Sequence, residues 1–470
     1  MSDSKTKTLG VFALAMINVA AVLSLRNYPS MATYGWSSIG WYLIGTIAFL
    51  IPLTLAGAEL ACGWPKGGGV YAWVREAFGE KAGFIAIFCE WSNNLVWFPT
   101  VLAFIASTFA YLFNPELANN NVFMFTVMMV AFWGTTAIGL MGEKVSSRFG
   151  SFGVVAGSII PAVLIIILGI VYITGGKPLA LPAFTWSAVV PEINMSTLPF
   201  ISTVVLLFAG MEMAGFHALE VRNPQTDFPK AMALSCVIIF ALTVIGTLAI
   251  AAVVPVGQLS LAAGLMQAFE IFLRAFNLEW LLAPLAVLVT LGGLALLLSW
   301  LAGPALGLGE VAAHGNMPPF FAKTNKNGAP TGVLILQAVL GTAVSMLYLF
   351  IPSISAAYWI LSAMTVLLLC IVYLMVFASL IKLRYSSPNT IRAFKIPGGM
   401  PGIWLVGGTG FFACLFTFVI SLLPPGNYEH ISTNEYAMIL IIGTAILALP
   451  PLVFLRLKKP GWMPIKKMED

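Results

Sequence analysis

The stretch "AAVLSLRNYPSMATYG", residues 20–35, interrupts an otherwise apolar segment near the start of the chain. It places Arg26, Asn27 and Tyr28 beside Pro29, which lacks a backbone N–H and clashes with the preceding helical turn. A charged side chain at the centre of a transmembrane helix costs about 2.5–3.5 kcal/mol on insertion scales. Irregular backbone at that depth is tolerated only where it is buried in protein or lines a cavity. We therefore expect an interrupted membrane helix at this position.

The composition of the whole chain is that of a membrane protein. Of its 470 residues, 60% are hydrophobic and only 9% are charged, with a mean hydropathy of +0.96. A soluble protein carries about 25% charged residues. The five cysteines have no metal-binding spacing, so we expect neither a metal site nor another cofactor. The net charge of +5 requires no nucleic-acid partner, because a basic tail near anionic lipid accounts for it.

Apolar stretches long enough to cross a bilayer recur along the chain. They predict an all-α polytopic membrane protein with 12 transmembrane helices. The predicted spans are 9–35, 37–62, 84–113, 122–142, 150–174, 199–221, 230–255, 281–308, 332–352, 355–381, 401–424 and 435–456.

Basic residues alternate strongly between the connections of these spans. With this assignment, 20 of the 23 lysines and arginines lie on one side, and only Lys177 and Arg274 lie on the other. The positive-inside rule then makes the first side cytoplasmic. We expect residues 1–8 and the tail 457–470 to be cytoplasmic, and the loop 175–198 to be extracellular, in a multi-pass protein of the cell membrane.

Few acidic residues fall within the predicted spans. Glu59 lies near the cytoplasmic end of its span, where we expect it to reach interfacial water or a loop lysine. Glu90 lies about two turns into its span, and it is either solvated from the cytoplasm or paired with Arg26. Glu212 stands between Gly210 and a second glycine, which together permit the sixth span to unwind.

The two interrupted spans are the first and the sixth. Because five spans precede the sixth, the two run in opposite directions through the membrane, as the discontinuous helices of an inverted repeat do. We therefore expect two halves, 9–174 and 199–381, followed by two further helices within 401–456. In such an arrangement the two breaks meet at mid-membrane and form a binding site.

Four motifs in order along the chain resemble the amino acid–polyamine–organocation (APC) transporter superfamily. They are "PKGGGVYAWVREAFG" (65–79), "FAGMEMAGFHALEVRNPQTDFPKAM" (208–232), "LSWLAGPALGLGEVAAHGNMPPFFAKTNKNGAP" (298–330) and "RAFKIPGG" (392–399). The Tyr-Pro pair that ends the first break and the phrase "NKNGAP" (325–330) are most similar to the glutamate/GABA antiporter-like branch.

The resemblance implies a LeuT-like 5+5 inverted repeat with two additional C-terminal helices, which moves an amino acid or amine by alternating access. It also implies that exposed backbone groups at the two breaks hold the substrate carboxylate and amine, and that a tyrosine on the tenth span lies near the substrate. Carried over to this chain, these residues are Val22, Leu23, Ser24, Ala209, Gly210, Met211 and Tyr373.

Arg26 has three possible roles. It binds a substrate carboxylate through its planar guanidinium, or it pairs with Glu90 or Glu212 as a gate, or it reaches the external surface. We expect Arg26 and Glu212 to contribute to substrate binding, and Arg26, Glu90 and Glu212 to contribute to gating or coupling.

The sequence favours a transporter over an enzyme or a channel. Its three histidines are scattered over different segments, which argues against a membrane enzyme, and no filter-like motif recurs. The span 150–174 contains no lysine or acidic residue that would carry a proton, which favours exchange of one substrate for another. A proton- or sodium-coupled symporter of the same fold is the alternative. The oligomeric state stays open.

Overall fold

The structure is a computed structural model that describes residues 10–64, 69–195, 197–212, 221–350, 354–392, 394–424 and 432–462. Within these ranges every regular element is a helix. Backbone hydrogen bonds of a membrane-spanning segment must be satisfied internally, and a helix does this within a single segment.

Ten helical stretches in the described ranges are long and apolar enough to cross a membrane. They correspond to ten of the twelve predicted spans, and their ends differ from the predicted ends by a few residues. The stretches are Ser37–Gly63, Glu80–Ala110, Asn121–Leu140, Val155–Thr174, Thr226–Val253, Glu279–Ala313, Thr331–Phe350, Ala357–Ser386, Gly399–Ile420 and Thr433–Arg456.

The two remaining predicted spans, 9–35 and 199–221, are not continuous helices. The first consists of α1 (Val11–Val22), a 3-10 turn (Leu25–Asn27) and α2 (Tyr28–Ala32). The second begins with α11 (Ile201–Phe208) and leaves the helix at Ala209. The expectation of twelve helices is therefore met only in part, because two of the segments are broken.

Pro29 does not cause the first break, contrary to our expectation. It lies in the first turn of α2, where its missing N–H would have no helical partner in any case. The chain leaves the helix earlier, at Leu23 and Ser24, which both have extended backbone angles.

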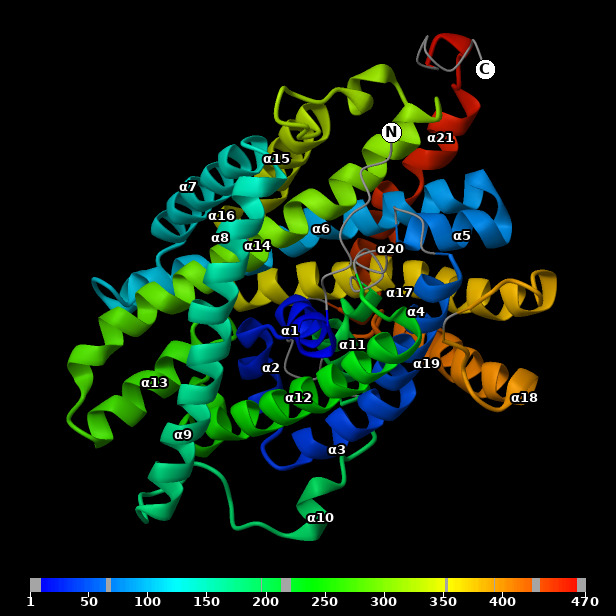
Figure 1. Cartoon of the computed structure of the whole chain (residues 1–470). Helices are drawn as coiled ribbons and strands as arrows, with labels where there is room; N and C mark the ends of the chain where they lie inside the picture. The colour runs from blue at the N-terminus through cyan, green and yellow to red at the C-terminus, as the bar shows by residue number, and fades with distance from the viewer. Residues whose placement is uncertain are drawn as a thin grey trace.

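Two long helices form the centre of the molecule (Figure 1). The spanning windows of α6 (Glu80–Ala110) and α17 (Ile354–Ser386) are 94% and 83% buried, whereas that of the C-terminal stretch Thr433–Arg456 is 17% buried. The two helices pack against each other, and α14 (Leu282–Ala313) packs against α6. They therefore form a scaffold against which the broken segments lie.

The other helices surround this centre. Around the broken segments lie α3 (Ser37–Gly45), α4 (Ile51–Gly63) and α12 (Pro224–Val253). The remaining helices are α5 (Val70–Phe78), α7 (Asn121–Leu140), α8 (Glu143–Val154), α9 (Ile160–Thr174), α10 (Trp186–Val189), α13 (Gly264–Ala275), α15 (Thr331–Ser345), α16 (Leu347–Phe350), α18 (Gly399–Ile403), α19 (Thr409–Ile420), α20 (Thr433–Ala448) and α21 (Pro450–Arg456).

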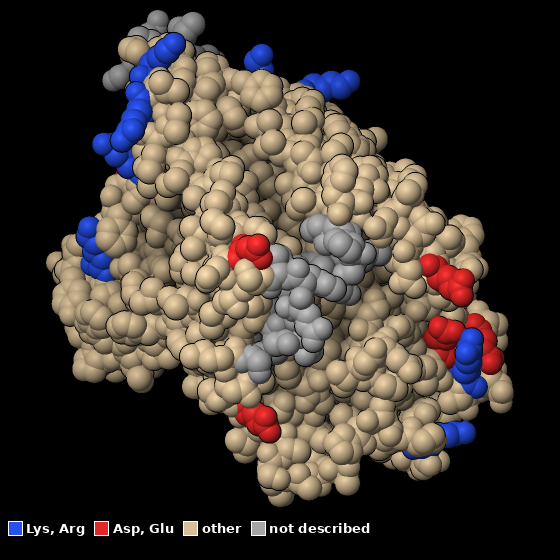
Figure 2. All heavy atoms as spheres, turned by 180° about the vertical axis from the view of Figure 1, so that it is seen from behind, with Lys and Arg blue, Asp and Glu red and all other residues tan. Residues whose placement is uncertain are grey.

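The connections fall into two groups at opposite ends of the molecule. In Figure 1, α5 and α21 lie at the upper right and α18 at the right, whereas α13 lies at the left and α10 at the bottom. Figure 2 shows lysine and arginine side chains mainly along the upper and left edges, whereas acidic side chains lie near the centre, at the lower edge and at the right of this face, where a few basic side chains accompany them. Much of the remaining surface is uncharged, as a lipid-facing belt requires.

Candidate functional site

The first break exposes two extended residues inside the molecule. Leu23 has φ −67° and ψ 103°, and Ser24 has φ −122° and ψ 106°, so their peptide groups leave the helical ladder. Leu23 still donates its N–H to the Val19 carbonyl, and Asn27 donates its N–H to the Ser24 carbonyl. The Ser24 hydroxyl is buried and has no hydrogen-bond partner among the described residues. It is therefore available to a bound molecule.

The second break follows α11, and the side chain of Glu212 folds back onto the backbone of this break. Gly210 has φ +112°, a conformation that L side chains rarely adopt. Its N–H donates to Glu212 Oε2 at 3.2 Å and also reaches Tyr373 Oη at 3.3 Å. Tyr373 in turn donates its hydroxyl to Glu212 Oε1 at 3.0 Å. The Glu212 carboxyl group thus occupies one of the backbone donors that we expected a substrate to use.

Arg26 lies at the centre of the molecule and is 1% exposed. This burial excludes the expectation that it reaches the external surface. Its Nη1 donates to Thr100 Oγ1 at 2.6 Å and to Tyr358 Oη at 3.2 Å. The guanidinium lies over the rings of Trp97 and Tyr358, at 5.8 and 5.4 Å from their centroids. These contacts are favourable to a cation but carry no negative charge.

No carboxylate neutralises Arg26 in the part of the chain that the structure describes. None of the ion pairs between described residues includes it, so the expected pairing with Glu90 or Glu212 is absent in this conformation. Its buried Nε–H also has no acceptor there. A buried cation without a counter-charge is costly, which makes Arg26 a strong candidate to bind an anion.

A cavity opens beside Arg26 and touches both breaks. Its volume is about 30 Å³, which is room for ordered water in this conformation. Four of its lining residues are polar in addition to Arg26, and the others are apolar or aromatic. The lining consists of Ser24, Arg26, Asn27, Asn93, Asn94, Trp97, Leu206, Ala209, Leu296, Trp300 and Leu369.

The structure brings some predicted site residues to this cavity and leaves others aside. Ser24, Arg26 and Ala209 line it. The remaining predicted residues belong to the helix breaks or to the Glu212 cluster but are not part of the lining; they are Val22, Leu23, Gly210, Met211, Glu212 and Tyr373.

Glu90 is buried on α6, and its Oε2 has no hydrogen-bond partner among the described residues. It lies near enough to Glu212 for their charges to interact. It is therefore not solvated from the cytoplasm in this conformation. His217, a further polar residue of the sixth span, lies outside the described residues.

Tyr358 and Thr100 are contacts of Arg26 that the sequence analysis did not single out. Tyr358 also donates its hydroxyl to Asn27 Oδ1 at 3.3 Å. The sequence could have identified Tyr358 by its spacing from Tyr373. The two tyrosines are 15 residues apart, or about four helical turns, and so lie on a similar face of α17. Thr100 carried no comparable signal, since threonines are common in membrane helices.

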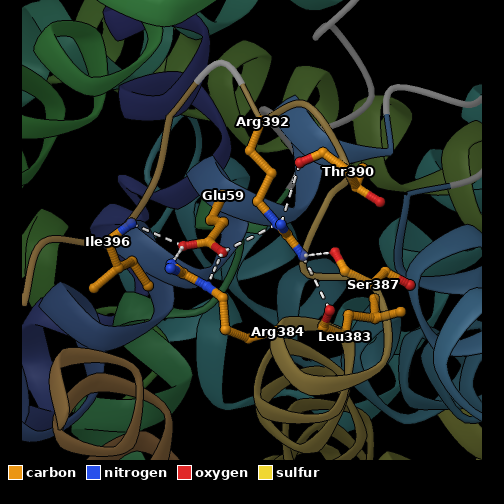
Figure 3. Close-up of polar contacts among 7 residues, drawn as sticks. All are labelled: Glu59, Leu383, Arg384, Ser387, Thr390, Arg392 and Ile396. Atoms are coloured by element: carbon orange, nitrogen blue, oxygen red, sulfur yellow. Dashed lines mark hydrogen bonds and ion pairs between the residues drawn. The ribbon is translucent and has the colours of Figure 1, made fainter. Parts of the chain in front are cut away.

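Glu59 overturns our expectation of an interfacial acid. It is 1% exposed and forms ion pairs with both Arg384 and Arg392 (Figure 3). It also accepts the backbone N–H of Ile396 at 2.8 Å. Its partners are arginines more than 300 residues away, which local sequence does not reveal.

Comparison with known proteins assigns the chain to a family. The family model described as amino acid permease matches residues 9–447. The chain belongs to the amino acid permease family. It is 40% identical to an uncharacterized transporter of Legionella pneumophila over 456 residues, which is 97% of each chain.

Other relatives of this permease have more specific names. The permease is 31% identical over 460 residues to a glutamate/gamma-aminobutyrate antiporter of Lactococcus lactis, and the match covers 96% of this chain and 90% of the relative. It is 23% identical to a probable agmatine/putrescine antiporter of the same species, over 97% of this chain and 96% of the relative. The permease is thus a multi-pass membrane transporter rather than an enzyme, and its family implies an amino acid substrate.

Proposed function

We propose that this permease exchanges amino acids across the cell membrane by alternating access, and that Arg26 binds a carboxylate of the substrate. The remaining polar groups of the cavity, from Ser24, Asn93 and Asn94, would hydrogen-bond the rest of the molecule. The substrate class is then an amino acid with at least one carboxylate that reaches Arg26.

The observation that carries this proposal is the isolation of Arg26. It is buried, lacks a carboxylate partner among the described residues, keeps a free Nε–H and lines a cavity between two helix breaks. A planar guanidinium binds a carboxylate through two parallel N–H donors, and such a bond is strong where water is excluded. A bound substrate would supply the missing negative charge.

Exchange is supported by the names of two relatives, both antiporters. We further infer a 5+5 inverted repeat, with halves 9–174 and 199–381 and two additional helices within 401–456. The broken helices, the first segment of each half, support this inference. The clustering of basic side chains at one end supports cytoplasmic termini.

Proton-coupled uptake is a second candidate, and Glu90 favours it. A buried carboxylate with a free oxygen near a second carboxylate is suited to bind and release a proton during transport. In that case a pH gradient, rather than an internal substrate, would drive accumulation.

The deciding experiment is transport by purified protein in liposomes. Vesicles are preloaded with single amino acids or amines, and uptake of a labelled panel is measured with and without internal substrate. We expect internal substrate to stimulate uptake at least tenfold, and Arg26→Gln to abolish that stimulation.

Arg274→Gln is the matched control, since Arg274 is exposed on α13 and forms an ion pair with Glu270 at 2.8 Å. It should transport as the parent protein does. If uptake needs an imposed pH or sodium gradient and is the same with and without internal substrate, the protein is a symporter. Unimpaired exchange by Arg26→Gln would remove Arg26 from the binding site.

A further inference from the structure

Glu59, Arg384 and Arg392 form a buried charged cluster well separated from the cavity, which we name the Glu59 cluster. Its three members come from α4, from the last turn of α17 and from the loop that follows α17 (Figure 3). Arg384 donates Nε to Glu59 Oε1 at 2.9 Å and Nη2 to Oε2 at 2.5 Å, a bidentate pair. Arg392 Nε lies 3.3 Å from Oε1.

Arg392 also closes the end of α17. Its Nη2 donates to the carbonyls of Leu383 and Ser387, at 3.0 and 2.9 Å, and its Nη1 donates to the carbonyl of Thr390. These carbonyls lie at or just beyond the C-terminus of α17, where a cation is favoured. The loop is thereby folded back onto the helix end, and Glu59 joins both to α4.

Both arginines of the cluster contact the same carboxylate, that of Glu59. Both of its oxygens are satisfied, and removing its charge would leave two arginines side by side without compensation. Breaking a buried ion pair by removing one partner is strongly destabilising, whereas the intact pair itself contributes little net stability. A contact of this kind is well suited to hold one conformation while it stays closed.

The helix that carries Arg384 also contacts both helix breaks. Tyr358 bonds Arg26 and Asn27 at the first break, and Tyr373 bonds Glu212 at the second. Arg384 follows Tyr373 by 11 residues, or about 17 Å along the axis. Because α17 contains neither glycine nor proline, it has no built-in hinge between these anchors.

The helix that carries Glu59, α4, also passes the second break. Gly57 of α4 faces the backbone of Glu212, and Glu59 follows two residues later. The ends of α4 and α17 joined by the Glu59 cluster are therefore the ends of the two helices that flank the second break. We place the passage from the cavity toward the basic end of the molecule, the end with α5, α18 and α21, near these two helix ends.

We propose that the Glu59 cluster is a latch that holds α4 and α17 together while the permease is closed toward its basic end, and that it separates when this end opens. The inference rests on the alternating-access mechanism proposed above and adds the contact that controls one of its two gates. Glu59 is then a conformational residue that binds no substrate.

The test measures side-specific access to the cavity without any substrate. Ser24→Cys places a thiol on the cavity wall, and a membrane-impermeant maleimide is added to right-side-out or inside-out vesicles. Labelling of this site is quantified by mass spectrometry, so the five native cysteines can remain. We expect Glu59→Gln to raise labelling from the basic end at least fivefold and to lower labelling from the opposite end.

Glu270→Gln is the matched control, because it removes the acidic partner of an exposed ion pair on α13. It should leave both rates within twofold of the parent. Cys414, which is buried elsewhere, reports global unfolding through its own labelling. Should Glu59→Gln fail to fold, Arg384→Lys keeps the charge but loses the bidentate geometry, and the same shift is expected from it.

If these substitutions leave the labelling rate from each end unchanged, the latch proposal is wrong. Simultaneous labelling of Cys414 would also overturn it, because the cluster would then only stabilise the fold. The proposed function is tested separately. If the protein exchanges no amino acid but shows the labelling shift, the latch proposal stands and the proposed function fails. If the protein exchanges amino acids without the shift, the proposed function stands and the latch proposal fails.

Discussion

At the scale of single residues, Arg26 determines the chemistry of the cavity. Its neighbours are a threonine hydroxyl, a tyrosine hydroxyl and two aromatic faces, all of them neutral. These groups solvate a guanidinium without cancelling its charge, so the cavity keeps a positive potential. In the proposed function such a site has an advantage, because a permanent ion pair at Arg26 would compete with the substrate carboxylate.

Tyr358→Phe tests this arrangement. The change removes the hydroxyl that accepts from Arg26 and donates to Asn27, leaving the ring in place. Losing the hydrogen bond to Arg26, the one that bears on substrate binding, costs about 1 kcal/mol, so we expect roughly a fivefold increase in the KM for exchange. Initial rates over a range of substrate concentrations measure it.

Tyr42→Phe is the control for this prediction. Tyr42 is buried, and its hydroxyl is hydrogen-bonded to Thr247 at 2.8 Å rather than to Arg26, so its removal should leave KM unchanged. Equal kinetic constants for Tyr358→Phe and the parent protein would show that the hydroxyl does not position Arg26.

At the scale of elements, glycines set how closely helices approach. Gly157, in the π-helical turn between α8 and α9, lies directly against Gly292 of α14. A Cβ on Gly157 would overlap the N–H of Gly292 and the carbonyl of Leu288. Small residues at such crossings allow helix backbones to touch, and in a membrane this packing replaces the hydrophobic effect as the source of association.

Gly157→Ala should therefore be costly despite its small size. The new methyl group meets backbone rather than a flexible side chain, so α8, α9 and α14 must move apart. Overpacking of this kind costs about 1–3 kcal/mol, which should lower the apparent Tm of the detergent-solubilised protein by several degrees.

The matched control is Gly134→Ala on α7, where a Cβ would meet no atom within 4 Å. Alanine favours a helix more than glycine does, so the Tm should stay constant or rise slightly. Similar Tm losses for both substitutions would mean that glycine flexibility, rather than close packing, explains Gly157.

At the scale of the whole molecule, charge sets the orientation in the membrane. Connections that hold most of the basic residues gather at one end, together with α5, α18 and α21. Translocating these charges during insertion is unfavourable, so we expect that end to stay in the cytoplasm.

Reporter fusions measure this orientation. Green fluorescent protein fused after Asp470 should fluoresce, and alkaline phosphatase at the same point should be inactive, since both termini are expected to be cytoplasmic. A fusion after Asn119, in the connection between α6 and α7, should show the reverse pattern. An active phosphatase after Asp470 would contradict the predicted topology.

Much of the fold could be predicted from the sequence because hydropathy is a local property. A span of about 20 apolar residues has to be a membrane helix wherever it occurs, so ten spans emerged with small errors at their ends. The position of the first break was less predictable. Pro29 suggested it, but proline fits the first turn of α2, and the extended residues are Leu23 and Ser24.

The sequence by itself determined the membrane class, the spans, the resemblance to the permease family and the location of the unusual charges. Only the tertiary structure decided which partners those charges have. Arg26 meets Thr100 and Tyr358 rather than an acid, and Glu59 meets two arginines rather than interfacial water. The reason is physical: a membrane charge is satisfied by groups on other helices, and the rotation and packing of those helices are not encoded locally.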